Sequence, residues 1–143
     1  MLFGQDRDQI RRFYHEVWRK QLAGDPLEPL EIMVRDVILD HPEYQGLLTD
    51  PDRALQREYL PENGETNPFL HMGLHIAIHE QIGTDRPAGI RDQYRKLLAA
   101  TGDAHQVEHR IMDCLTEMIW RAQRDGIAPD EAGYLQCLQR LAR

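Results

Sequence analysis

Serine is absent from the 143 residues of this chain. A Ser-His-Asp triad is therefore excluded, which leaves a thiol, a threonine hydroxyl or a metal-bound water as the familiar nucleophiles. The sequence also lacks any apolar run near the roughly 20 residues that span a bilayer, and its charged start lacks the apolar centre of a secretory signal. These absences predict a soluble, cytoplasmic protein with no membrane partner.

Cysteine is scarce, and the two cysteines, Cys114 and Cys137, each fall within a helical pattern. They do not have the CxxC spacing typical of a redox motif. Because disulfides are rare in a reducing cytosol, the sequence predicts two buried or partly buried free thiols rather than a disulfide.

Basic residues are outnumbered, since 17 Lys and Arg face 24 Asp and Glu and the formal net charge is −7. Binding to a nucleic-acid backbone depends mostly on clustered Lys and Arg, so this balance argues against a nucleic-acid partner. The hydrophobic content of 41% and charged content of 29% are ordinary for a soluble globular protein. The length predicts a single domain over residues 1–143.

Apolar residues recur at spacings of three and four along most of the chain, as they do in amphipathic helices. Cap residues, prolines and glycines divide this pattern into segments. No stretch alternates like a strand, so the sequence predicts an all-α, single-domain bundle of six or seven helices, with Trp18 and Trp120 anchoring the core. The expected helices cover residues 6–23, 28–40, 67–83, 88–100, 103–124 and the segment after 130, with shorter turns or helices at 41–48 and 50–60 and a loop at 61–66.

Histidine is the residue that stands out, because five of the seven lie between His71 and His109. Four of these five form two His-x-x-x-His pairs, His71/His75 and His105/His109. Residues four apart lie one above the other on a helix face, so both rings of a pair can point at one ion. Two such helices side by side would assemble four ring nitrogens.

Other polar residues extend this pattern. Glu108 flanks the second pair on its helix, and His41 follows a helix end at a Pro-broken turn that can aim its side chain inward. His79 falls at the edge of the face that holds the first pair, which makes it a weaker candidate ligand. Glu80 falls on the far side and is weaker still.

Imidazole and carboxylate ligands suit a divalent transition metal such as Zn, Ni or Fe(II). The first hypothesis is therefore a metal-binding bundle with His71, His75, His105, His109, Glu108 and His41 as candidate ligands. If this bundle is also a metal-dependent enzyme, an open coordination position would activate water or a thiol, and a nearby carboxylate would act as the base. The second is a metal-free interaction module with a buried, hydrogen-bonded histidine cluster. The third is a metal-free enzyme in which one histidine acts as a general base beside Glu108 or Glu117. The sequence identifies no substrate, and it leaves homo-oligomerisation open.

Two strings, NPFLHMGLHIAIHEQIGTDRPAGI at Asn67–Ile90 and GDAHQVEHRIMDCLTEMIWRAQR at Gly102–Arg124, resemble a bacterial family catalogued as a domain of unknown function, numbered 1841. The similarity extends to HPEY at His41–Tyr44 and covers most of the chain. It implies a small, soluble bacterial protein and supplies no activity. Ferritin-like bundles are a looser analogy, because they repeat Glu-x-x-His whereas this chain has a single His105-x-x-Glu108.

Overall fold

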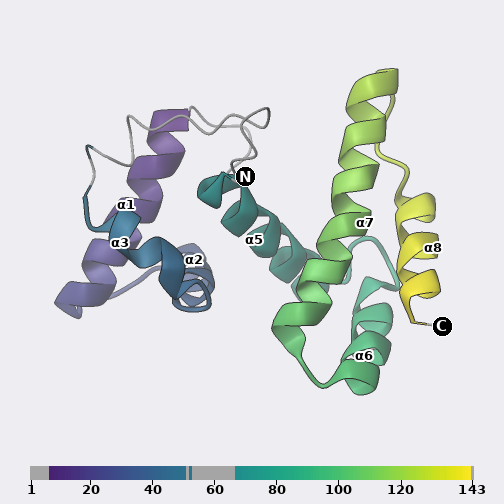
Figure 1. The fold of residues 1–143 in the computed structure, drawn as a ribbon, viewed down its shortest axis with the longest axis horizontal. Helices are drawn as coiled ribbons and strands as arrows, with labels where there is room; N and C mark the ends of the chain where they lie inside the picture. Colours follow the sequence, from purple (N-terminus) through teal and green to yellow (C-terminus); the bar gives the residue numbers. More distant parts are fainter. Residues whose placement is uncertain (1–6, 51, 53–66, 143) are drawn as a thin grey trace. The chain divides into compact units, whose positions relative to one another are not determined.

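The computed structural model describes residues 7–50, 52 and 67–142, and these residues form helices without strands (Figure 1). Seven α-helices and one short 3-10 helix lie in this described part, so the prediction of an all-α chain with six or seven helices is confirmed. Most of the predicted segment at 50–60, and all of the predicted loop at 61–66, lie outside the described residues. Among the described helices, none has the length and apolar content needed to cross a membrane.

The chain divides into two compact units, the first ending at Ile76 and the second beginning at Ala77. The boundary falls within helix α5, Pro68–Thr84, so each unit contains about half of this helix. The expectation of one domain over residues 1–143 stays a prediction.

The first unit combines helix α1 (Arg7–Ala23), helix α2 (Pro29–Leu39), the 3-10 helix η2 (Pro42–Tyr44), the short helix α3 (Gln45–Leu48) and the first half of α5. Helix α1 packs against both α2 and α3. The apolar stripes of these helices meet in a core that excludes water. Burial of this apolar surface is the main force that holds such short helices together. The core residues are Tyr14, Val17, Trp18, Val34, Val37, Ile38, Leu48, Phe69, Met72 and Ile76.

Local signals account for the limits of α1 and α2. Gly24 adopts a positive φ of 74° directly after α1, a conformation that glycine takes without steric cost. Helix α2 begins with a capping box between Glu28 and Glu31, and Lys20 of α1 lies 2.9 Å from the Glu31 carboxylate. These contacts set the turn between the two helices.

The second unit contains the end of α5, helix α6 (Ile90–Thr101), helix α7 (Ala104–Asp125) and helix α8 (Glu131–Leu141). Figure 1 shows α8 returning antiparallel alongside α7, and α6 contacts both of these helices. Asp103 and Asp130 cap α7 and α8 through side-chain oxygens that accept backbone N–H groups. The packed apolar residues of this unit include Ile90, Leu97, Val107, Ile111, Leu115 and Leu138.

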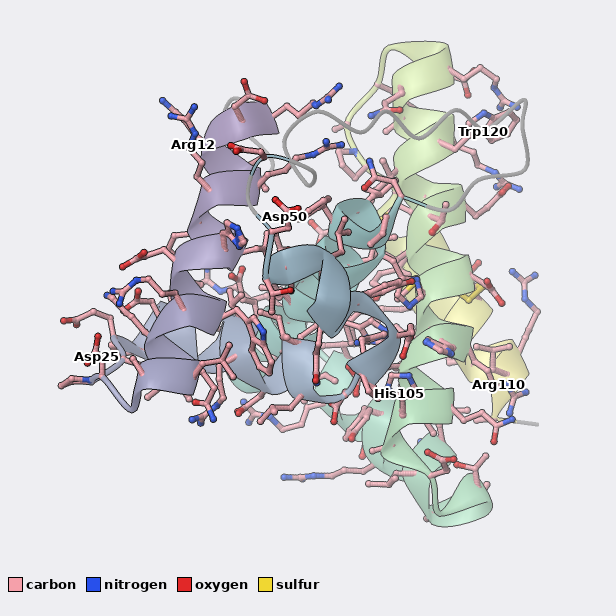
Figure 2. All side chains as sticks on the ribbon, turned by 60° about the vertical axis from the view of Figure 1, so that its left-hand side comes forward. Arg12, Asp25, Asp50, His105, Arg110 and Trp120 are labelled. Carbon is pink, nitrogen blue, oxygen red and sulfur yellow. A yellow bond between two sulfur atoms is a disulfide. The ribbon has the colours of Figure 1, made fainter. Side chains whose placement is uncertain are left out.

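The prediction of two free thiols is wrong, because Cys114 and Cys137 form a disulfide (Figure 2). The antiparallel packing of α7 and α8 brings their Cα atoms to 5.9 Å, within the range that a disulfide needs. The two residues are 23 positions apart in sequence. A pattern read along each helix separately does not reveal this pairing.

Two further expectations are corrected. Trp120 is 51% exposed and not a core anchor, whereas Trp18 is 6% exposed. On an ideal helix Trp120 lies about 160° from the Val107/Ile111 face, and the Arg124 guanidinium stacks over its ring at 4.5 Å. Helix α5 also continues past Gly83 to Thr84. The carbonyls of Ile82 and Gly83 near its end accept hydrogen bonds from the Arg91 side chain.

Candidate metal-binding histidines

His41 lies at the junction between α2 and η2, where the backbone leaves the helix before Pro42. Its side chain is buried, and its Nδ1 atom is 2.8 Å from the carbonyl oxygen of Val37. Because a carbonyl oxygen only accepts, Nδ1 carries the proton in this bond. The hydrogen bond therefore selects the tautomer in which Nε2 is the basic, metal-ligating nitrogen.

His71 and His75 occupy successive turns at the start of α5, as predicted. Their Nε2 atoms are 3.2 Å apart, and the two ring centroids are separated by 4.8 Å. His75 is 1% exposed, while His71 is half-buried. Both rings therefore direct the same nitrogen toward one point, which a histidine pair must do to share an ion.

His41 joins this pair within the first unit. Its ring centroid lies 5.1 Å from that of His71 and 4.7 Å from that of His75. The ring of Tyr44 stacks nearly parallel to that of His41, with the two centroids 5.4 Å apart. We call His41, His71 and His75 the histidine triad. The chain thus brings three of its six predicted ligands together in one unit.

The spacing within the triad fits ligation. Zinc binds imidazole nitrogen at about 2.0–2.1 Å in tetrahedral geometry, which places two such nitrogens about 3.3 Å apart. The observed 3.2 Å between the Nε2 atoms of His71 and His75 matches this spacing. The same distance also fits a hydrogen bond in which one neutral ring donates to the other. Geometry alone therefore supports two uses of the triad, a metal centre and a hydrogen-bonded cluster.

The second predicted pair, His105 and His109, lies in the first turns of α7. The two ring centroids are 4.4 Å apart, and the rings offer nitrogens within 4.8 Å of each other. Figure 2 labels His105 on α7. Both side chains are half-buried. The two rings of this pair therefore lie next to each other on α7, as the four-residue spacing predicts. That both pairs share a single ion stays a prediction.

Glu108 has a partner that sequence reasoning underrated. His79 on α5 makes a 2.5 Å hydrogen bond with Glu108 through its Nε2 atom. Glu108 is 6% exposed. Burial, together with the nearby negative charge of Glu108, raises the pKa of Tyr94. One carboxylate oxygen is therefore engaged by His79, so a ligand role for Glu108 stays a prediction that would use its other oxygen.

The signal for His79 was present in the sequence. It follows His71 and His75 at the next four-residue step, which extends one face of α5 by another turn. Contact with Glu108 depends on how α5 and α7 pack within the second unit, so helix periodicity alone did not predict it. Carboxylate–imidazole pairs of this kind often support metal-ligating histidines.

A sequence model of a family described as a domain of unknown function, DUF1841, matches residues 6–140. No curated protein and no solved structure matches the chain.

Proposed function

We propose that this chain, which belongs to the DUF1841 family, binds a divalent transition-metal ion through its clustered histidines. The observation that carries the proposal is the triad, in which three imidazoles lie with ring centroids 4.7–5.1 Å apart and two Nε2 atoms lie 3.2 Å apart. Imidazole nitrogen suits Zn, Ni and Fe(II). The hydrogen bond from His41 to Val37 supplies the orienting contact that metal-binding histidines typically have.

The proposal includes the second pair. His105 and His109 repeat the arrangement of His71 and His75 on α7, and His79 with Glu108 adds a carboxylate–imidazole pair next to them. Histidines from both pairs would complete a site with nitrogen ligands, and Glu108 would add an oxygen. Ligation from two helices is the usual construction of metal sites in helical bundles.

The test is metal content per chain, measured by mass spectrometry on untagged protein purified without chelator or nickel resin and then loaded with Zn²⁺. We expect about one ion per chain, and a more than tenfold loss of affinity in His75→Ala. His41→Asn is the sharper variant, because its side-chain amide can still donate to Val37 but offers no Nε2. It should keep its thermal stability and lose metal affinity.

Matched variants identify the ligand set. His15→Gln removes a histidine of α1 that lies outside the triad, and it should bind metal as the unchanged chain does. His109→Ala should weaken binding as His75→Ala does if both pairs hold the ion. Normal binding in His109→Ala would restrict the site to the triad. Unchanged metal content in both His75→Ala and His41→Asn would overturn the proposal.

A metal-free interaction module is the second candidate, because the 3.2 Å contact between His71 and His75 is also an ordinary hydrogen-bond distance. Exposed apolar side chains such as Leu70 and Ile127 are compatible with a protein partner. In this case the unmodified protein would take up no Zn²⁺, and His75→Ala would change its thermal stability without changing metal content.

The proposed location is cytoplasmic, as the sequence predicts. The Cys114–Cys137 disulfide is more typical of oxidising compartments. Thiol alkylation of the protein in freshly broken cells would test the location, since a cytoplasmic chain should be found reduced.

A further inference from the structure

The first unit contains a cavity of about 400 Å³ that the histidine site does not use. It lies along α1, and Leu48 and Thr49 at the end of α3 also line it. Its volume is at the lower end of the range for small-molecule sites. The residues that matter for the argument are Arg12, His15, Trp18, Leu22, Leu48 and Thr49.

Apolar side chains make up one part of the cavity lining. Trp18 and Leu48 are almost fully buried, and Leu22 at the end of α1 is 64% exposed. Leucine exposed to this degree beside a buried indole leaves apolar surface that a ligand could cover. The cavity therefore fits a molecule with an apolar body.

Some polar groups of the lining lack a hydrogen-bond partner among the described residues, in contrast to Glu16, Arg19 and Thr49, which have one. Nε1 of Trp18 and both ring nitrogens of His15 are buried, and they make no hydrogen bond in the part of the chain that the structure describes. Buried N–H groups nearly always have a partner, so unsatisfied ones at a cavity point to a bound acceptor. Both residues sit on one side of α1, at a spacing of three.

The charge near these nitrogens is provided by arginine. Arg19 is held by Glu16, with contacts of 2.6 and 2.9 Å, so these two charges compensate each other. Arg12 is exposed at the same cavity and has no ion pair among the described residues, and Figure 2 shows its side chain projecting from α1. Asp50 contributes negative charge near His15. An arginine without an ion pair, neutral N–H donors and a nearby carboxylate suit a monoanion better than a polyanion.

We propose that this cavity binds a small carboxylate with an aromatic or short aliphatic body. The apolar body would contact Trp18, Leu22 and Leu48. The carboxylate would accept hydrogen bonds from the Trp18 indole and the His15 ring, with Arg12 supplying the positive charge. This inference is independent of the histidine triad and of metal binding.

The probe is 4-phenylbutyrate, and 4-phenylbutanol is the uncharged control of similar size. Both are titrated into the full-length Trp120→Phe chain, in which Trp18 is the only indole. Fluorescence and the single indole N–H resonance in ¹⁵N NMR then report on the cavity directly. We expect saturable binding of the acid below about 1 mM, at least about tenfold tighter than binding of the alcohol.

Arg12→Gln and His15→Gln should each weaken binding of the acid by about fivefold or more and leave binding of the alcohol unchanged. Arg95→Gln, which removes an exposed arginine from α6, should bind both probes as the parent does. Equal affinity for acid and alcohol would overturn carboxylate recognition, and no shift of the indole resonance by about 5 mM acid would overturn the site itself. The comparison of the two probes uses the Trp120→Phe chain without a further substitution, so it stands even if Arg12→Gln or His15→Gln fails to fold.

Discussion

His41 donates its Nδ1 proton to the Val37 carbonyl at 2.8 Å, and this bond decides which ring nitrogen can act as a ligand. The same contact helps to satisfy a carbonyl at the end of α2, where helical partners run out. One residue thus has a structural bond and a candidate chemical role on opposite sides of its ring. Because the two functions use different ring nitrogens, His41→Asn can remove the candidate ligand atom and keep the hydrogen bond to Val37.

His15 gives a prediction on pH. Burial lowers the pKa of its imidazole from the usual value, and the nearby charges of Asp50 and Glu16 only partly oppose this effect. A folded-state pKa below the unfolded value means that the unfolded chain binds the proton more tightly. The contribution of His15 to stability is therefore complete above about pH 6.5 and is lost as the pH falls below that value.

We expect His15→Gln to lose less free energy of unfolding than the unmodified chain between about pH 7.5 and pH 5. Urea unfolding at a series of pH values measures this difference. A steeper loss of stability in the variant would show that protonated His15 is favoured in the fold, contrary to the direction given by burial.

At the scale of elements, the disulfide joins α7 to α8 within the second unit. It closes a loop with a sequence separation of 23 residues, and a loop of this length restricts the unfolded chain by about 3 kcal/mol in the chain-entropy description. The double variant Cys114→Ala/Cys137→Ala should therefore unfold at a lower urea concentration, with a loss of about 3 kcal/mol or less.

The control for this prediction is reduction of the unmodified protein, which removes the same cross-link and keeps both side chains. Reduced protein and the double variant should have similar free energies of unfolding. If reduction leaves the urea midpoint unchanged, the cross-link does not contribute to the stability of the α7–α8 pair.

Helix α5 carries two of the candidate metal ligands, His71 and His75, together with His79. Asn67 accepts hydrogen bonds from the backbone N–H groups of Phe69 and Leu70 at its start, and Arg91 donates to the carbonyls of Ile82 and Gly83 at its end. Both ends of the helix are thus satisfied. A well-capped helix holds His71, His75 and His79 in register on successive turns.

At the scale of the whole molecule, each unit contains one tryptophan, Trp18 in the first and Trp120 in the second. Single-tryptophan variants, Trp120→Phe and Trp18→Phe, therefore report the unfolding of each unit separately. Bound Zn²⁺ stabilises the unit that provides its ligands, by about 2.7 kcal/mol when the free Zn²⁺ concentration is a hundred times Kd. If both histidine pairs hold the ion, the melting temperature should rise with both reporters.

A rise in melting temperature seen with only one of the two tryptophans would locate the ion in one unit. A rise seen by Trp18 alone would assign the ion to the triad of His41, His71 and His75. A rise seen by Trp120 alone would contradict the central role given to the triad, because that tryptophan lies on α7 with His105 and His109.

Local sequence determined most of the secondary structure. The helices begin and end within a few residues of the predicted limits, because caps such as Asp103 and Asp130 act through hydrogen bonds over two or three residues. The two histidine pairs were equally predictable, since helix geometry alone places residues four apart on one face.

Only the tertiary structure decided the remaining contacts. The disulfide between Cys114 and Cys137, the bond between His79 and Glu108, and the exposure of Trp120 each depend on which helix faces meet. The approach of His41 to His71 and His75 depends on the packing of η2 and α5 in the first unit. Periodicity along the chain shows which residues share one face of a helix. Which other helix packs against that face is decided by contacts between apolar side chains far apart in sequence.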